Sequence, residues 1–181
     1  MKKCNWQAVD AASNDGAGRL PAGGYVARIT NVEDVPSREY IYIEYDIAEG
    51  EYAGHYANVT DRPYLHRFVK GYGDKAMPFF KQFLEALQFS NPGRFDWARW
   101  MERSDEREFI GLEIGIVVQD EQYTNTRGED KVRQNVVGIY ASQDIRNGEF
   151  KVPEPKDSRE KVGAPQASTA ATEGAYDDVP F

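Results

Sequence analysis

The sequence predicts an all-β domain, a small β-barrel of five strands with a helical insertion between the third and fourth strands, followed by a disordered C-terminal tail. Three observations lead to this prediction. Apolar and polar residues alternate over several short stretches, as they do in half-buried strands. One central stretch changes to helical spacing. The final stretch, residues 154–181, lacks the apolar residues that a core needs.

The composition limits the class of protein. The chain has 181 residues, 40% hydrophobic and 13% aromatic, which suffices for one domain with appendages. The net charge of −8 argues against coating nucleic acid by bulk charge, so such binding would need a local basic face. The single cysteine cannot form an intrachain disulfide, and no apolar run has signal-peptide or membrane-span length. We therefore expect a cytoplasmic protein without membrane contact.

Three regions are expected along the chain. Residues 1–19 form a flexible polar lead-in, residues 20–153 form the folded domain, and residues 154–181 form an acidic tail. In the tail, six acidic residues outnumber three basic ones. The helical insertion occupies residues 75–103 of the domain.

The first three strands are expected to form an antiparallel meander over residues 25–32, 39–47 and 55–60. The second stretch alternates most regularly. Its two faces are Ile41, Ile43, Tyr45 and Ile47 on the apolar side, and Tyr40, Tyr42, Glu44 and Asp46 on the wetter side.

Helical spacing follows at residues 74–89, where Phe79, Phe80, Phe83, Leu84 and Leu87 are expected to form a packing stripe. A short helix at residues 96–103 places Trp97, Trp100 and Met101 on one face, also expected to pack. Strand patterns return at residues 109–123 and 131–140. This strand order is that of an OB-fold barrel, although an SH3-like barrel or a small sandwich would give a similar pattern.

Residues 62–72, which we call the basic-aromatic segment, interleave cations with aromatic rings. The candidate DNA-binding residues here are Arg62, Tyr64, Arg67, Lys70 and Tyr72. Single-stranded nucleic acid is bound by cations that follow the phosphates and by rings that stack on the bases. The alternative is a crossover segment whose rings fill the core beneath a solvated, charged rim.

Tyr40 and Tyr42 stand two residues apart on the wetter face, where an OB barrel offers its binding platform. Arg28 on the neighbouring strand would supply a cation, and Tyr56 completes the candidates in this part of the sheet. The alternative is tyrosine pairing that only stabilises the sheet. Two acidic residues on the same face argue against a phosphate track there.

The turn between the last two strands, residues 123–133, contains four further candidates that could close over a nucleic-acid strand: Tyr123, Arg127, Lys131 and Arg133. Glu129 and Asp130 partly offset the positive charge of these residues. The alternative interpretation is an ordinary mobile hairpin.

No enzyme motif is found. The carboxylates of Glu44, Asp46, Glu49 and Asp61 would have to converge from several elements to bind catalytic metals, and the alternation favours a solvated strand face instead. The chain has neither a phosphate-binding glycine-rich loop nor a nucleophile elbow. Two distant histidines and one cysteine cannot form a thiolate or imidazole site. We expect a protein that is not an enzyme and needs no cofactor or metal.

The last five residues have the chemistry of a partner-binding tip: Asp177, Asp178, Val179, Pro180 and Phe181. The carboxylates would attract a basic rim, the phenyl ring would fill an apolar socket, and the proline limits the unbound conformations. The alternative is a polar terminus with a chance phenylalanine.

This tip resembles the acidic Asp-Asp-(Ile/Val)-Pro-Phe tip of bacterial single-stranded-DNA-binding proteins, which recruits replication, recombination and repair enzymes. Residues 20–25, 45–52 and 145–153 resemble phage- and prophage-encoded single-stranded-DNA-binding proteins with an OB fold. The resemblance implies that the protein binds and protects single-stranded DNA in the host-cell cytoplasm. The helical insertion departs from the pattern of the bacterial housekeeping proteins. The resemblance therefore does not imply their tetramer interface, and a homo-oligomer is left as an open alternative.

Two other functions remain open. A phage adaptor or assembly protein would bind protein partners without touching DNA. A nuclease or recombination enzyme is the third alternative, and metal-dependent cleavage of single strands would reveal it.

Overall fold

The computed structural model describes residues 19–59 and 63–159. Its main feature is one sheet with the strand order β3-β2-β1-β4-β5, in which neighbouring strands are antiparallel, and a short β6 that runs parallel to β4. The strands are β1 Gly23–Val35, β2 Tyr40–Ile47, β3 Arg67–Gly71, β4 Glu113–Thr124, β5 Asp130–Tyr140 and β6 Lys156–Ser158. The helices are α1 Met77–Ser90, α2 Trp97–Trp100 and α3 Ser142–Asn147, with 3-10 turns at Pro36–Arg38, Pro63–His66 and Glu106–Phe109.

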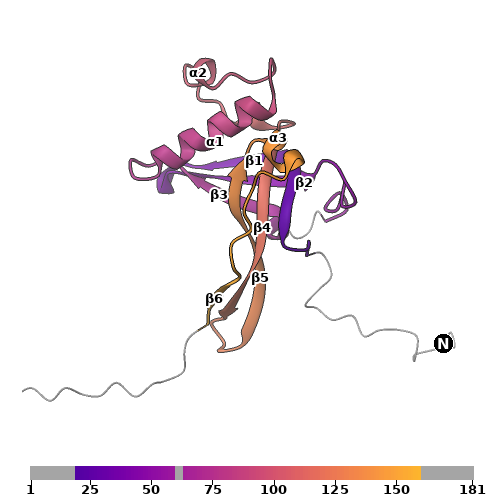
Figure 1. Ribbon diagram of the computed structural model, residues 1–181. Coiled ribbons are helices and arrows are strands. Elements are labelled where there is room, and N and C mark those ends of the chain that lie inside the picture. The colour runs from indigo at the N-terminus through magenta and orange to yellow at the C-terminus, as the bar shows by residue number, and fades with distance from the viewer. Residues whose placement is uncertain (1–18, 60–62, 160–181) are drawn as a thin grey trace, which may run out of the picture.

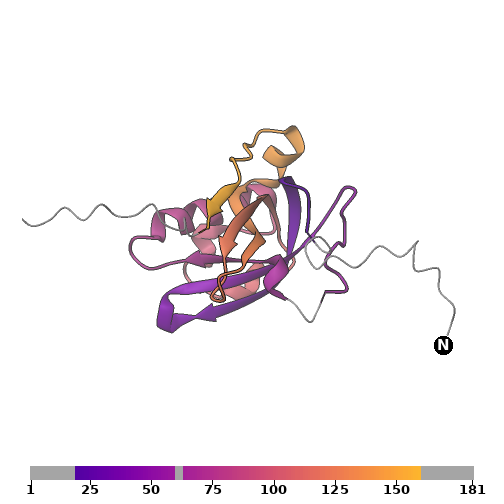
Figure 2. The same ribbon diagram turned by 90° about the horizontal axis from the view of Figure 1, so that it is seen from below.

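Strand β1 connects the two halves of the sheet. Its residues 23–28 pair with β4 and its residues 27–35 pair with β2. The register with β2 shifts between Ile29 and Asn31, and such a bulge bends a strand and increases its twist. The strands consequently curve around the core rather than lying in one plane (Figure 2).

The sheet is open among the described residues. β3 pairs with β2 and β5 pairs with β4, but β3 and β5 do not pair with each other. A groove lies between these two edges. The mostly β character of the domain and its helices between the third and fourth strands are confirmed. The described residues form an open sheet and do not show the closed barrel expected from the sequence.

The third strand lies later in the chain than predicted. Residues 51–58 form successive turns instead of a strand, with Gly50 and Gly54 at φ of 85° and 73°. Positive φ suits glycine because it has no side chain to clash. The strand that pairs with β2 is β3, inside the basic-aromatic segment.

The helical insertion packs against the same face of the sheet as the main core. Phe83 of α1 and Phe109 are fully buried there, and Trp100 is buried with its indole N–H donating to the Asp105 carbonyl oxygen at 2.8 Å. Trp97 is half-buried against this cluster. Phe79, predicted as part of the packing stripe, is instead 66% exposed.

The β4–β5 hairpin extends beyond the body, and β6 lies beside its distal half (Figure 1). The sequence predicted a tail without structure from residue 154, so β6 is a correction to that prediction. At the other terminus, Leu20 is held by Gln134, whose amide accepts the Leu20 N–H at 3.1 Å and donates to the Leu20 carbonyl oxygen at 2.6 Å. No helix in the described ranges is both long enough and apolar enough to cross a membrane.

Candidate nucleic-acid interface

Two tyrosines and an arginine meet on the outer face of β2 and β3. Tyr40 and Tyr42 point away from the core, because alternate residues of β2 are buried. Their ring centroids are 5.0 Å apart at 74°, and their hydroxyl oxygens are 3.0 Å apart. The Arg67 guanidinium of β3 lies over the Tyr42 ring, 4.1 Å from its centroid. The sheet register thus builds an aromatic-cationic surface from two strands.

Two arginines lie beside the tyrosine pair, and Glu44 lies on the same face of β2, opposite Arg67 in the register. The hydrogen bond with Tyr40 raises the pKa of Tyr42, so its phenol is uncharged. Arg67 forms no ion pair with a described residue, and Arg38 in the preceding turn is exposed and close enough to act electrostatically on Tyr42. Sequence reasoning missed Arg38, which becomes recognisable only when the β1–β2 turn is placed beside the tyrosines.

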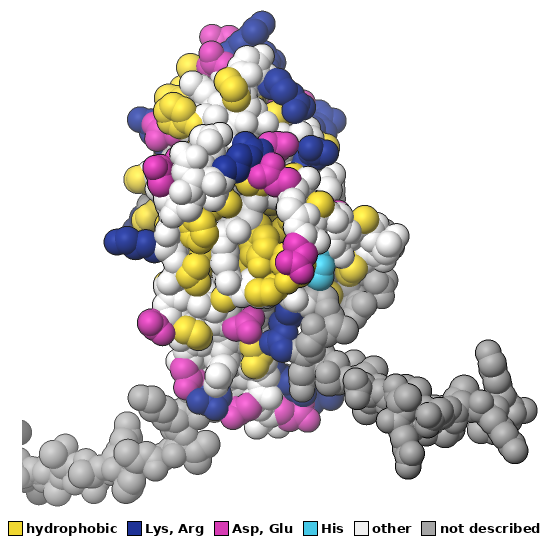
Figure 3. All heavy atoms as spheres, turned by 45° about the vertical axis from the view of Figure 1, so that its right-hand side comes forward, with side chains coloured by type: hydrophobic (Ala, Val, Ile, Leu, Met, Phe, Trp, Pro, Cys, Tyr) yellow, Lys and Arg dark blue, Asp and Glu magenta, His cyan; other side chains and the backbone are white. Residues whose placement is uncertain are grey.

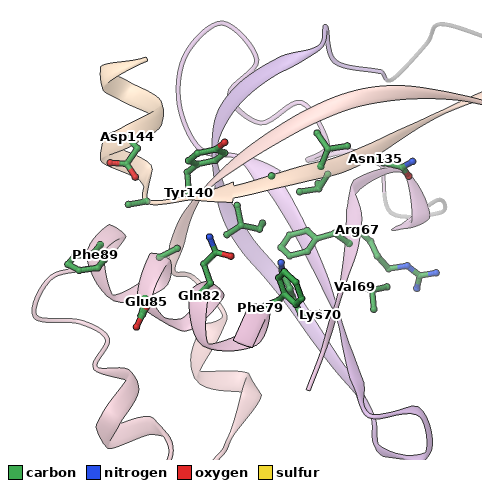
Figure 4. A pocket seen from close by; sticks show the side chains of 17 residues that line it. Arg67, Val69, Lys70, Phe79, Gln82, Glu85, Phe89, Asn135, Tyr140 and Asp144 are labelled. Atoms are coloured by element: carbon green, nitrogen blue, oxygen red, sulfur yellow. The ribbon is translucent and has the colours of Figure 1, made fainter. Parts of the chain in front are cut away.

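A groove of about 790 Å³ continues from this surface around the free edge of β3. β3 and β5 form its two sides, and α1 lies across it (Figure 4). Two cations and two acids line it, Arg67 and Lys70 on β3 with Glu85 and Asp144 opposite. Burial removes water from the Lys70 ammonium group, which makes its charge more costly and lowers its pKa.

The groove also contains phenylalanine side chains that the sequence did not mark as functional. Phe79 and Phe89 of α1 are 66% and 71% exposed. Both sit at helical positions next to core residues, so their spacing resembles a packing stripe. Only the orientation of α1 on the sheet shows that these rings face solvent, where they can contact a base or another apolar group.

The candidates on the hairpin are partly neutralised by neighbours. Lys131 pairs with Glu129 at 3.7 Å, and Arg133 pairs with Glu121 at 2.9 Å. The Arg133 guanidinium also lies over the Tyr123 ring, 4.9 Å from its centroid. The hairpin therefore presents fewer available cations than its sequence indicates. Arg127 in the turn is exposed and forms no ion pair with a described residue.

Other predicted candidates are placed differently. Tyr56 is only 3% exposed, with its ring stacked on His66 at 4.9 Å, so it belongs to the core and not to the interface. The Tyr72 hydroxyl donates a hydrogen bond to Asp34 at 2.8 Å, which raises the pKa of Tyr72 to about 12. Tyr72 lines a separate groove beside Trp100 and not the groove between β3 and β5. Tyr64 is 63% exposed just before β3 and remains available. Arg62 lies outside the described residues.

Arg28 belongs to an ion-pair chain rather than to the tyrosine surface. Its guanidinium contacts Glu113 at 3.3 Å, and Glu113 also contacts Arg146, which in turn contacts Glu49. Burial would raise the pKa of Glu113, but hydrogen bonds from the two arginines outweigh it and lower the pKa. This chain links α3 to the sheet, so Arg28 has a structural partner.

Two of the carboxylates considered for metal binding, Asp46 and Glu49, have other partners in the described part of the chain. Asp46 accepts the backbone N–H groups of Ile47 and Tyr56, both at 2.8 Å, and Glu49 is bound to Arg146. Asp61 lies outside the described residues. Within residues 19–59 and 63–159, no group of three or more metal-ligating side chains is found.

A buried carboxylate fixes β6 to the hairpin. Glu121 of β4 is 4% exposed and accepts hydrogen bonds from Arg133 at 2.9 Å, Ser158 at 2.6 Å and Asn135 at 2.5 Å. Lys156 adds an ion pair at 3.4 Å. The hydrogen bonds from Arg133 and Ser158 lower the pKa of Glu121 to about 2.

Glu121→Gln is expected to release β6 from β4. Loss of charge-assisted hydrogen bonds worth about 2 kcal/mol should speed amide exchange of residues 156–158 roughly 30-fold. Because the folded pKa is depressed, the stabilisation is present above about pH 4.5 and is lost as the pH falls towards about 2. Hydrogen exchange detected by mass spectrometry measures both effects. The matched control is Glu129→Gln, which changes an exposed carboxylate and should leave the amide exchange of residues 156–158 unchanged. Equally faster exchange in both variants would show that Glu121 does not hold β6 to β4.

No protein-family model matches this chain, and a search of curated proteins found no significant similarity.

Proposed function

We propose that this protein binds single-stranded DNA without catalysing a reaction. The observation that carries the proposal is the half-buried Tyr40–Tyr42 pair, with Arg67 over the Tyr42 ring, on the outer face of the sheet beside the groove along β3. Bases stack on such rings, whereas phosphates are attracted to the cations that flank them. The sequence resemblance described above supports DNA as the ligand.

The strand order supports a relation to OB-fold barrels. In those barrels the ligand crosses the outer face of the second and third strands, which is where Tyr42 and Arg67 meet. A strand crossing here would continue into the groove between β3 and β5 and approach Arg127 at the hairpin turn. We further propose that the tip at residues 177–181, which lies outside the described residues, recruits replication, recombination or repair proteins in the cytoplasm of a phage-infected host.

The proposal is tested by the fluorescence anisotropy of labelled oligothymidylate and of a labelled duplex. We expect the single strand to bind at least about tenfold more tightly, because only unpaired bases can stack on the rings. Equal affinity for the two, or no binding to either, would overturn the proposal; the second result would favour an adaptor that binds proteins only. Metal-dependent cleavage of the oligonucleotide would instead indicate a nuclease.

Salt dependence gives a second, quantitative check. Arg38, Arg67, Lys70 and Arg127 are cations without an ion pair to a described residue. Three or four phosphate contacts predict that log K falls against log salt with a slope of about −2 to −3. A slope near zero would contradict a phosphate track along these residues.

A further inference from the structure

A second groove, of about 560 Å³, lies on the helical insertion between the end of α1 and α2. We call it the insertion groove. Its apolar wall is formed by Phe89, Pro92 and Phe95. Three arginines also line it: Arg94, Arg99 and Arg103. Lys and Arg side chains gather at this end of the molecule, which is uppermost in Figure 3. The insertion groove thus combines aromatic rings with cations, the two kinds of group that bind single-stranded nucleic acid.

One exposed ring connects the insertion groove with the groove between β3 and β5. Phe89, near the end of α1, lines both of them. In Figure 4 it lies on the side of the β3–β5 groove opposite Arg67. The Phe89 side chain is 71% exposed, so a base can stack on its ring. A strand that follows the β3–β5 groove away from Arg67 would therefore meet the insertion groove at Phe89.

Two of the three arginines have charge available for a phosphate. Arg103 is neutralised by Glu108 through hydrogen bonds of 2.7 and 2.6 Å. Arg94 is exposed and donates to the Gly111 carbonyl oxygen at 3.5 Å, and neither Arg94 nor Arg99 forms an ion pair with a described residue. A phosphate can approach both of these guanidinium groups from solvent without displacing a carboxylate.

The charge balance distinguishes this groove from the others. Its three arginines face two acids, Glu108 and Asp96, and Asp96 is occupied as the N-cap of α2. The β3–β5 groove has two cations and two acids among its lining residues. The groove of about 490 Å³ beside Trp100 is lined by Asp34 and Glu106 and has no cation among its described lining residues. A polyanion that leaves the β3–β5 groove is therefore attracted to the insertion groove and repelled by the groove beside Trp100.

We propose that the insertion groove is a second contact for the same DNA strand and lengthens the stretch of DNA that one molecule covers. Arg94 and Arg99 would each pair with a phosphate, and a base would stack on Phe89. The inference rests on the proposed function, and it assigns a binding role to an insertion whose sequence predicted only packing. Along α1 the distance from Phe79 to Phe89 is about 15 Å. A short strand held at the tyrosine pair would therefore not contact the insertion.

Fluorescence anisotropy with two labelled oligothymidylates tests the second contact. One OB fold covers about 4–16 nucleotides, so strands of about 5 and about 16 nucleotides sample this range. Arg94→Gln combined with Arg99→Gln should weaken binding of the longer strand about tenfold and change binding of the shorter strand less than about twofold. The loss of two phosphate contacts should also make the salt slope of the longer strand shallower by about 1.4.

The matched control removes two exposed cations that line neither groove, Lys75→Gln with Arg107→Gln. Both strands should bind this variant within about twofold of the parent protein. Circular dichroism verifies that each variant is folded. An equal loss of affinity in the two double variants, or an equal effect of the Arg94 and Arg99 substitutions on both strands, would overturn the proposal.

Photocrosslinking locates the strand on the protein. An oligothymidylate of about 16 nucleotides that carries 4-thiothymidine is expected to crosslink to residues 88–99, detected by peptide mass spectrometry. Crosslinks confined to β2, β3 and the hairpin would overturn the second contact and leave the proposed function intact. If neither oligonucleotide binds the parent protein, the proposed function fails, and this inference fails with it.

Discussion

Replacing both Tyr40 and Tyr42 by alanine is expected to weaken binding of labelled oligothymidylate at least about 30-fold. Each base stacked on an aromatic ring contributes ~1–3 kcal/mol, so loss of both rings costs about 2 kcal/mol or more. Arg67 would also lose the ring over which its guanidinium lies at 4.1 Å. Anisotropy titration at fixed salt measures the change.

The matched control for this experiment keeps the rings. Tyr40→Phe combined with Tyr42→Phe removes the contact between the hydroxyl groups, which are 3.0 Å apart, but preserves both stacking surfaces. We expect affinity within about threefold of the parent protein. If the alanine variant binds as tightly as the phenylalanine variant, the tyrosine pair only stabilises the sheet and the interface lies elsewhere.

Phe83→Ala is expected to destabilise the domain by about 3–5 kcal/mol, a large part of the 5–15 kcal/mol typical of a folded domain. The Phe83 ring is fully buried, with centroids 5.5 Å from Phe109, 5.9 Å from Phe80 and 6.4 Å from Phe68. Truncation leaves a cavity between α1 and the sheet. Urea unfolding followed by circular dichroism measures the loss.

Phe79→Ala on the same helix is the matched control. Its ring is 66% exposed, so truncation should change stability by less than about 0.5 kcal/mol. The same two variants separate stability from function, since Phe79 lines the groove along β3 and Phe83 does not. Similar destabilisation by both substitutions would contradict the orientation of α1.

The two phenylalanines also show that the insertion is part of the domain. Phe83 lies in one cluster with Ile43 of β2 and Ile114 of β4, so α1 covers the sheet face that would otherwise be exposed. Removing the helix would uncover this face. The helical stretch predicted as an addition to a barrel therefore completes the core of the open sheet.

Several elements were predictable because their signal is local. The alternation at residues 39–47 identified β2 and assigned Tyr40 and Tyr42 to its less buried face, which the burial pattern confirms. Helical spacing placed α1 within three residues of its observed start. The hairpin of β4 and β5 was predicted with its turn, because Asn125 and Gly128 are typical turn residues.

The third strand was misplaced for a physical reason. Residues 55–60 and residues 67–71 are both short segments with weak alternation, and β3 buries only Phe68. Its pairing with β2 depends on residues that are distant in the sequence, such as Ile43 opposite Phe68. His66, buried between the Tyr45 and Val59 carbonyl oxygens at 2.9 and 3.1 Å, holds the preceding loop against the core.

The sequence by itself determined that this is a mostly β protein with a tyrosine pair on the less buried face of one strand, because side chains alternate strictly along a strand. Only the tertiary structure decided that Arg67 lies over Tyr42, that Phe89 borders two grooves, and that Glu121 binds β6. These contacts join residues far apart in the chain. Long-range pairing leaves no periodic trace in the local sequence, so the candidate surface is formed only when the strands are assembled.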